Sequence, residues 1–259
     1  MNILITSGGT SEKIDEVRKI SNMATGRLGS LIADTLLNIE GIAVTYLCSE
    51  DALTPQNSRA EVLRIDNVQN LKIALEKLLQ EQVFDAIIHA MAISDYTVKY
   101  SAASEELEQF LANSLMENNT DISIQEHLLS RLHQALSEYT GHQSSAKISS
   151  DIARLFLCLE KTPKIIRMFK QLQPKAVLVG FKLLAGAKVS DLLQAARKLM
   201  NENKCDFVLA NDKRNIDADH HAGILLGTDQ TIQYLYTKQE IANAISRSVI
   251  QTIEGRCQK

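Results

Sequence analysis

The feature that most constrains this fold lies at the start of the chain, where a short apolar run meets a glycine turn. The run at 3–6 has the length and apolar character of a buried strand, and Gly8 and Gly9 follow it closely. An amphipathic helix is expected to begin at Arg27, directly after Gly26. A buried strand that leads through a glycine turn to a helix N-terminus is how α/β proteins bind anions. The sequence therefore predicts a phosphate-binding edge.

Strand-length apolar runs alternate with helical periodicity along most of the chain. The runs at 86–88 and 176–179 are apolar without alternation, which favours central strands of a parallel sheet covered on both faces. Near the end, runs at 222–226 and 231–236 flank a Gly-Thr-Asp-Gln turn and indicate a hairpin. We predict an α/β fold: a Rossmann-like, mostly parallel twisted sheet with helices on both faces and a C-terminal antiparallel hairpin. The other expected strands cover 3–6, 43–48, 61–65, 85–91, 154–159, 176–181 and 206–210, and the expected helices cover 27–38, 68–80, 163–172, 189–201 and 239–251.

The stretch at 101–146 differs from the rest. It has no strand-like run, is rich in Glu, Gln, Asn and Ser, and carries helical patterns near 105–117 and 124–139. Only three prolines occur in the chain, so no Pro-rich linker divides it. We expect one domain over 1–259, with 101–146 as an inserted helical or flap segment.

Composition narrows the classes of partner. A net charge of -3 provides no basic field to attract nucleic acid or an anionic membrane. The four cysteines are scattered without a C-x-x-C pair, so neither a zinc site nor a disulfide framework is indicated. Met1 leads directly into the first strand, and no apolar run approaches the roughly 18–20 residues of a membrane span. We expect a cytoplasmic protein with reduced thiols, and a loop position for the pair His220-His221.

Ligands of open parallel sheets bind beyond the carboxyl ends of the strands. Polar clusters are expected at such ends at 7–10, 94–95, 161–162, Lys182 and 211–213.

Several nearby side chains have both a structural and a functional interpretation. Asn22 is either a turn residue or an amide that binds a carboxylate or an oxyanion. Arg18 is either a solvated charge or a residue whose guanidinium binds an acidic substrate through two hydrogen bonds. Asp95 either caps a helix or binds ribose hydroxyls or a metal. Lys147 is either a surface residue or a counter-charge to a triphosphate, and Phe181 belongs either to the core or to a base-binding site opened by the glycine before it.

Eight short motifs recur in order along the chain: 6–10 (TSGGT), 15–22 (DEVRKISN), 25–29 (TGRLG), 90–96 (AMAISDY), 147–148 (KI), 161–165 (KTPKI), 179–182 (VGFK) and 210–212 (AND). This set resembles the phosphopantothenoylcysteine synthetases (phosphopantothenate–cysteine ligases), in the stand-alone bacterial form found in streptococci. The resemblance covers nearly the whole chain except 101–146.

The resemblance implies a reaction of coenzyme A biosynthesis. Enzymes of this family join 4'-phosphopantothenate to L-cysteine, using CTP in most bacteria and ATP in animals to form an acyl-nucleotide. The resemblance also implies Mg²⁺ and a homodimer. The chain departs from the bacterial pattern at Ser149 and Asn203, and Lys198 is displaced by one position from the usual lysine. We still expect CTP rather than ATP, through an acyl-cytidylate.

The resemblance also implies roles for individual residues. The implied catalytic residues are Asn22 and Lys147, and the implied substrate-binding residues are Arg18, Ala92, Gly8 and Gly9. The implied nucleotide-binding residues are Asp95, Thr162, Pro163, Lys164, Ile165, Phe181, Thr25, Gly26 and Lys198. The metal ligands are not assigned.

Two other classes stay open at this point. A short-chain NAD(P) oxidoreductase fits the strand–helix order and Glu50-Asp51, but the chain lacks G-x-G-x-x-G, and Tyr96 and Lys99 have the wrong spacing for a Tyr-x-x-x-Lys pair. A non-catalytic nucleotide-binding module would not need Asn22 and Lys147 together.

Overall fold

The computed structural model describes residues 1–116, 124–141, 147–216 and 220–257. Contacts divide the chain into two compact units. The main unit comprises 1–10, 22–94 and 163–259, and the second unit comprises 11–21 and 95–162. The single domain over 1–259 with an insertion at 101–146 stays a prediction.

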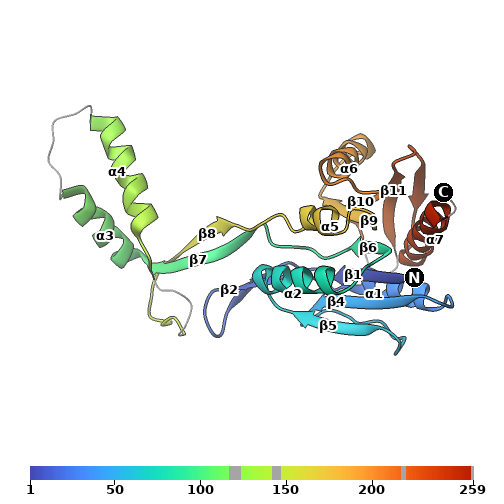
Figure 1. Ribbon diagram of the computed structural model, residues 1–259. Helices are drawn as coiled ribbons and strands as arrows, with labels where there is room; N and C mark the ends of the chain where they lie inside the picture. The colour runs from blue at the N-terminus through green and yellow to red at the C-terminus, as the bar shows by residue number, and fades with distance from the viewer. Residues whose placement is uncertain (117–123, 142–146, 217–219, 258–259) are drawn as a thin grey trace. The chain divides into compact units, whose positions relative to one another are not determined.

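The main unit is built on an eight-stranded sheet of order β12-β11-β10-β9-β6-β1-β4-β5 (Figure 1). Along the sheet, every neighbouring pair from β5 through β4, β1, β6 and β9 to β10 is parallel. The pairs β10–β11 and β11–β12 are antiparallel. This arrangement confirms the predicted mostly parallel sheet with its C-terminal hairpin. The strands are β1 (Asn2–Ser7), β4 (Ala43–Ser49), β5 (Glu61–Ile65), β6 (Ala86–His89), β9 (Val177–Leu184), β10 (Phe207–Ile216), β11 (His221–Gly227) and β12 (Ile232–Leu235).

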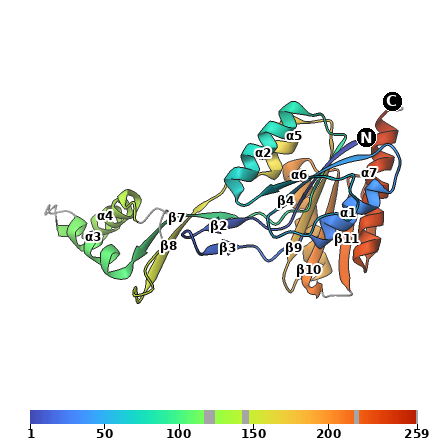
Figure 2. The same cartoon turned by 90° about the horizontal axis from the view of Figure 1, so that it is seen from below.

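Helices cover both faces of this sheet, as Figure 2 shows. The helices α1 (Arg27–Leu37) and α7 (Lys238–Cys257) pack on one face. The other face carries α2 (Val68–Glu81), α5 (Ile166–Leu172) and α6 (Val189–Asn203). Strand β1 explains why both faces need cover: Ile3 and Ile5 enter the core under α1 and α7, whereas Leu4 enters the opposite core. Burying each such side chain contributes about 1.5–3 kcal/mol.

The second unit has two small antiparallel sheets. One pairs β2 (Ser11–Lys13) with β3 (Lys19–Ser21), and the other pairs β7 (Tyr96–Ala103) with β8 (Leu155–Lys161). The helices α3 (Ser104–Met116) and α4 (Ile124–Glu138) lie between β7 and β8 in the chain. Edge-to-face contacts of Tyr139 with Tyr100 and Phe110, at ring distances of 5.1 and 4.9 Å, join β7, α3 and the end of α4.

Three sequence expectations are wrong in detail. Residues 101–103 belong to β7, although 101–146 was expected to lack strands; Ser and Ala have low strand propensity, and it is pairing with β8 that makes them a strand. The helix expected from Pro163 begins at Ile166, because Thr162 N still donates to Asp95 O and the chain must then turn. His221 lies in β11 rather than a loop, since its N–H donates to Tyr236 O.

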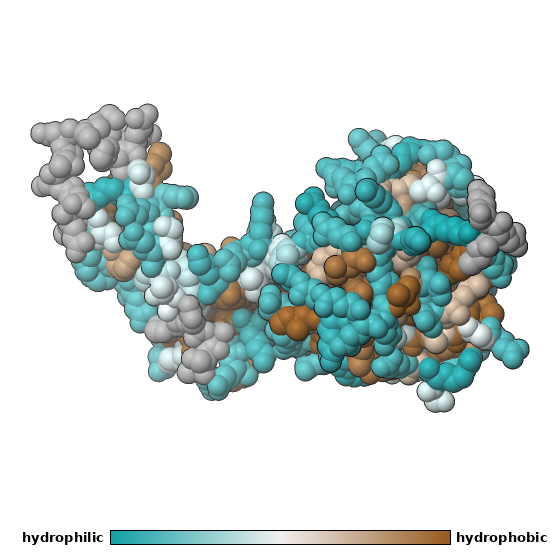
Figure 3. Space-filling view, viewed as in Figure 1, coloured by the Kyte–Doolittle hydropathy of each residue, from teal (hydrophilic) through white to brown (hydrophobic). Residues whose placement is uncertain are grey.

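The surface of the main unit is mixed. Figure 3 shows hydrophilic residues over much of its visible face, with apolar residues in separate patches. Among the described residues, no helix combines the length and the apolar character that crossing a membrane requires.

Candidate functional site

The glycine turn after β1 is a position that side chains cannot occupy. Gly8 has φ +85°, and a Cβ added there would lie 2.2 Å from Ser49 Oγ. A Cβ on Gly9 would lie 2.5 Å from Asn22 O, and Gly9 N donates to Ser49 Oγ at 3.2 Å. The turn is therefore bare of side chains at the carboxyl edge of β1, because Ser49, Ala52 and Asn22 fill the space in which Cβ atoms would lie.

Asn22 and Ala92 meet beside this turn. Asn22 Nδ2 donates to Ala92 O at 2.9 Å, and Asn22 N donates to Thr10 O at 3.2 Å. Thr10 N also donates to Ala92 O, and Thr10 Oγ1 accepts from Ser94 N at 2.9 Å. Asn22 Oδ1 accepts no hydrogen bond from the described residues. The half-buried amide is thus fixed in place with an unused oxygen and a second N–H.

The start of α1 lies after the same edge. Gly26 is its N-cap with φ +76° and has no side chain to cap the helix, and Arg27 N donates a long hydrogen bond of 3.5 Å to Thr25 Oγ1. Ser7 Oγ donates to Gly26 O at 3.1 Å, and Leu53 N donates to Thr25 O at 3.0 Å, so the turn before the helix is held from both sides. The first amides of a helix are orphan donors that carry partial positive charge. Thr25 and Gly26 thus lead into a turn suited to an anion.

In the second unit, Asp15 joins two distant segments. Its side chain is fully buried and accepts from Arg18 Nε at 2.9 Å, from Arg18 Nη2 at 2.6 Å and from Ile148 N at 3.2 Å. Arg18 Nη2 also donates to Ile148 O at 3.0 Å. The Arg18 guanidinium holds the pKa of Asp15 well below its usual range. This clamp fixes the backbone directly after the exposed Lys147.

Asp95 does not lie at the end of a buried strand, where the sequence predicted it. Strand β6 ends at His89, so Asp95 does not directly follow a buried strand; it lies exposed immediately before β7. Thr162 N donates to Asp95 O at 3.1 Å, which brings these two predicted nucleotide-binding residues together in the second unit. The reason for the difference is that 90–92 leaves the β6–β9 ladder and continues along the glycine turn, as the Gly9–Ala92 bridge shows.

The segment after Thr162 belongs to the main unit. Pro163 and Lys164 are exposed. Ile165 is 2% exposed and packs in the core, so only its backbone is open to a ligand.

Phe181 is not at a strand end, because β9 continues to Leu184. It is half-buried and packs against the core under α1 and α7. The glycine before it opens no space for a base: a Cβ on Gly180 would lie 3.1 Å from Cys205 Sγ and 3.2 Å from Leu199 Cδ2. That close approach serves packing within the protein.

Lys198 lies on the exposed side of α6. Its Nζ is 3.9 Å from Glu202 Oε1, and its side chain is 74% exposed. The buried apolar residues of this helix, Leu192, Ala196 and Met200, pack in the core instead.

Two polar residues at the carboxyl edge received no role from sequence reasoning. Asp212 lies inside β10, 4% exposed, and accepts from Gly186 N, Ala187 N and Arg214 N at 2.8–3.0 Å, which lowers its pKa. His89 is the last residue of β6 and is 8% exposed. One sequence feature could have identified both residues, since each is a polar residue at the end of an apolar run.

The predicted site residues are thus shared between the two units. The main unit holds Gly8, Gly9, Asn22, Thr25, Gly26, Ala92, Pro163, Lys164, Ile165, Phe181 and Lys198; the second unit holds Arg18, Asp95, Lys147 and Thr162. No group of three or more His, Cys, Asp or Glu side chains within the described ranges is arranged to hold a metal.

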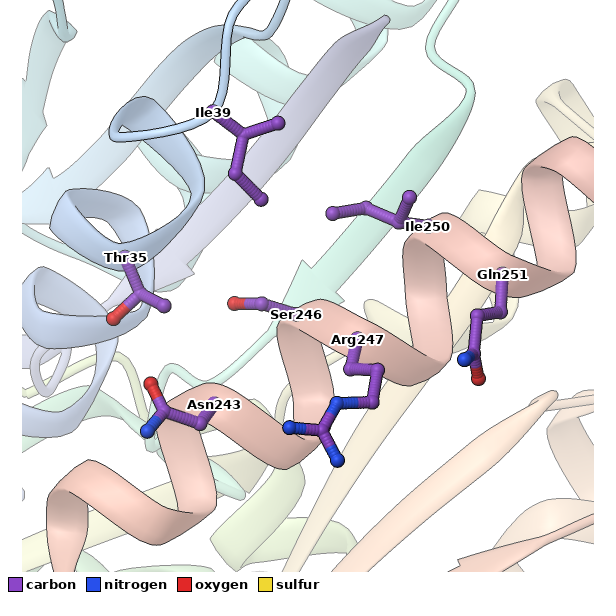
Figure 4. A pocket seen from close by; sticks show the side chains of 7 residues that line it. All are labelled: Thr35, Ile39, Asn243, Ser246, Arg247, Ile250 and Gln251. Atoms are coloured by element: carbon purple, nitrogen blue, oxygen red, sulfur yellow. The ribbon is translucent and has the colours of Figure 1, made fainter.

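A hollow of about 320 Å³ lies elsewhere in the main unit, between α1 and α7 (Figure 4). Thr35 of α1 faces Asn243 and Ser246 of α7 across it. None of its lining residues is a predicted site residue.

The sheet order, the helices on both faces and the bare glycine turn at the carboxyl edge define a Rossmann-like α/β protein with a candidate anion site. The family model of the DNA/pantothenate metabolism flavoprotein C-terminal domain matches residues 1–135 and 116–253. The chain belongs to this family.

Individual relatives agree with this assignment. The crystal structure of the DNA/pantothenate metabolism flavoprotein from Streptococcus pneumoniae is 36% identical, covers 97% of this chain and 99% of its own, and has a TM-score of 0.77. The coenzyme A biosynthesis bifunctional protein CoaBC of Thermococcus kodakarensis is 28% identical over 94% of this chain and 49% of its own length. A Cab2 mutant H337A complex with phosphopantothenate-cysteine shares the fold, with 17% identity over 98% of this chain and 88% of its own and a TM-score of 0.63. The chain spans about half the length of the curated relatives it matches.

Proposed function

We propose that this protein is a phosphopantothenate–cysteine ligase, which joins 4'-phosphopantothenate to L-cysteine through an acyl-nucleotide. Family membership supports this reaction class, and a structural neighbour is a complex with phosphopantothenate-cysteine. The observation that carries the proposal is the fixed amide of Asn22 at Ala92 O, beside the bare turn at Gly8 and Gly9. A neutral amide with spare hydrogen-bonding capacity is suited to a carboxylate that becomes an acyl phosphate.

The reaction has two displacements. A carboxylate oxygen of 4'-phosphopantothenate attacks the α-phosphorus of the nucleotide, the bond to the β-phosphate oxygen breaks, and pyrophosphate leaves. The cysteine amine then attacks the acyl carbon, loses a proton, and displaces the nucleoside monophosphate. In this scheme Asn22 donates to the substrate carboxylate and later to the oxyanion of the second displacement. In this proposal the substrate lies beside Ala92, at the turn formed by Gly8 and Gly9.

The nucleotide phosphates need positive charge and donors. The start of α1 after Thr25 and Gly26 offers backbone amides for them, since the N-cap Gly26 has no side chain to occupy these donors. The family resemblance assigns Lys147 to the phosphates, Arg18 to the substrate, and Asp95, Phe181, Lys198 and the residues from Thr162 to Ile165 to the nucleotide. We further propose that Mg²⁺ enters with the nucleotide phosphates, since Mg²⁺ commonly uses few protein ligands in such sites.

We also propose that CTP is preferred over ATP, that the protein acts as a homodimer, and that it is cytoplasmic. The first two points come from the resemblance to stand-alone bacterial members of the family, and the third comes from the scattered cysteines of the sequence.

Pyrophosphate release tests the proposal. Purified protein is incubated with 4'-phosphopantothenate, cysteine and Mg²⁺, with CTP or ATP in turn, and each component is omitted in a control. The proposal expects release that depends on 4'-phosphopantothenate and a nucleotide, faster with CTP, and a product of the mass of phosphopantothenoylcysteine when cysteine is present. Absence of that product with both nucleotides would contradict it.

A further inference from the structure

His89 lies at the centre of the sheet, at the edge where ligands of such folds bind. It is the last residue of β6, between β1 and β9. Its register partners are Thr6 on one side and Gly180 on the other. Thr6 is followed almost at once by the turn at Gly8 and Gly9, and His89 is followed three positions later by Ala92, so both neighbours lead into the predicted substrate-binding segments.

The imidazole is held on two sides. Its Nδ1 is 2.6 Å from Thr6 Oγ1, and its ring meets the ring of Phe169 edge to face at 4.9 Å. Thr6 and Phe169 are both fully buried. Burial lowers the pKa of His89 to about 4, so the ring is neutral and carries a single N–H at neutral pH.

The hydrogen bond to Thr6 decides which nitrogen carries that proton. Within the described part of the chain, the Thr6 hydroxyl has no partner besides His89 Nδ1. A buried hydroxyl whose proton is left unpaired is costly, by about 1–3 kcal/mol. The Thr6 hydroxyl therefore donates to Nδ1, Nδ1 is the acceptor, and the proton of the ring sits on Nε2.

The Nε2–H group has no hydrogen-bond partner among the described residues. The buried side-chain nitrogen and oxygen atoms that lack a partner in those residues are Ser104 Oγ, His221 Nδ1 and Ser246 Oγ. His89 Nε2 is not one of them, and the residue as a whole is 8% exposed. A neutral donor of fixed tautomer is thus presented at the carboxyl edge of β6.

We propose that His89 is a binding residue of the substrate site, whose Nε2–H donates a hydrogen bond to an anionic oxygen of a bound substrate. The inference rests on the proposed function for the identity of the substrate. Two molecules carry such oxygens, 4'-phosphopantothenate and the nucleoside triphosphate, and the experiment below separates them. Because the imidazole is neutral, it donates a hydrogen bond to the substrate but does not neutralise the negative charge of the substrate.

Two isosteric substitutions separate the ligand contact from a structural role. The amide of His89→Gln reaches the position of Nε2, whereas the amide of His89→Asn reaches the position of Nδ1 and keeps a partner for Thr6. We expect His89→Gln to keep kcat/KM within about threefold of wild type, and His89→Asn to fold but to lose tenfold or more. The substrate whose KM rises in His89→Asn is the one that receives the hydrogen bond. Full activity of His89→Asn, or equal loss in both variants without a change in either KM, would overturn the assignment.

A second measurement does not depend on turnover. In wild type with ¹⁵N-labelled histidine, we expect the His89 ring to show its proton on Nε2, and Thr6→Val to yield a mixture of tautomers. Adding 4'-phosphopantothenate, CTP or ATP singly should shift the Nε2 resonance for one class of molecule. If wild type makes product and no compound shifts Nε2, the role of His89 is wrong and the ligase proposal stands. If a compound shifts Nε2 and no product forms, the proposed reaction is wrong and the binding role stands.

Discussion

Asn22 Nδ2 donates to the carbonyl oxygen of Ala92 at 2.9 Å, which ties the turn before α1 to the segment after β6. The two residues are 70 positions apart in the chain. Because the bond uses one amide proton, the side chain is held in one orientation without losing its capacity for a ligand. This arrangement accounts for an asparagine rather than a charged residue at this position.

Asn22→Asp should abolish ligase activity with little effect on nucleotide binding. A carboxylate at this position faces the Ala92 carbonyl without a proton to donate and repels the substrate carboxylate. We expect kcat/KM to fall at least 100-fold, the order seen when an oxyanion donor is removed. Steady-state kinetics and nucleotide titration by calorimetry provide the measurement. Asn243→Asp on the exposed side of α7 is the matched control, and equal activity of both variants would return Asn22 to the role of a turn residue.

Lys147→Gln should slow turnover more than it destabilises the fold. The residue is exposed, so its removal should change stability by about 0.5 kcal/mol or less. In its proposed role Lys147 offsets charge on the leaving pyrophosphate, so its removal should reduce the rate by about tenfold or more, equivalent to about 1.4 kcal/mol. Thermal melting and pyrophosphate release are measured side by side, with the exposed Lys77→Gln of α2 as control. A lower Tm with unchanged turnover would show that Lys147 is structural.

Asp15→Asn should release the segment that follows Lys147. The neutral amide presents N–H groups where the buried carboxylate now accepts from Arg18 and from Ile148 N. We expect faster hydrogen exchange of the Ile148 amide and slower turnover. Exchange is followed by NMR, with Asp151→Asn, an exposed carboxylate nearby in the chain, as control. Unchanged exchange at Ile148 would show that the clamp is not needed to hold this segment.

Stability should fall as the pH is lowered from about 6.5 to about 4. Burial lowers the pKa of both His89 and His221 to about 4, whereas an unfolded histidine titrates near 6.5. Between these pH values the unfolded chain binds protons that the folded chain does not. Each histidine therefore lowers the free energy of unfolding by about 1 kcal/mol for every unit by which the pH falls. Asp15 has its pKa lowered instead, so the stability it contributes is lost at lower pH, below the ordinary range of a carboxyl group.

Urea denaturation at pH 7.5 and at pH 5 measures this loss. We expect His89→Asn to reduce the difference between the two values, because one of the two buried titrating groups is removed. The exposed His133→Asn of α4 should leave the difference as in wild type. An undiminished difference in His89→Asn would contradict the burial-based explanation.

Much of the fold follows from local sequence patterns. Strands such as β1 and β9 are apolar on both faces because helices cover both, and such runs are recognised without long-range information. Strand β7 was not predicted, since its Ser and Ala residues are extended through pairing with β8, more than 50 positions away. His221 was misplaced for the same reason, because a bond from its N–H to Tyr236 O makes it part of the sheet.

The candidate site likewise has residues that local sequence predicts and residues that depend on distant contacts. The glycine turn was predicted because Gly8 and Gly9 directly follow a buried strand. Asp15 received no role, because its function depends on Ile148, 133 positions away. His89 was missed because a histidine at the end of an apolar run carries no sign of its tautomer until Thr6 is seen opposite it.

The transfer of a labelled oxygen tests the central claim most directly. 4'-Phosphopantothenate with ¹⁸O in its carboxylate is turned over with cysteine and CTP, and the products are analysed by mass spectrometry. With both carboxylate oxygens labelled, an acyl-nucleotide route predicts one ¹⁸O in the released CMP, one ¹⁸O kept in the amide carbonyl of phosphopantothenoylcysteine, and unlabelled pyrophosphate. Label in inorganic phosphate, with CDP as the other product, would contradict the account, because it would show that the carboxylate attacks the γ-phosphate instead.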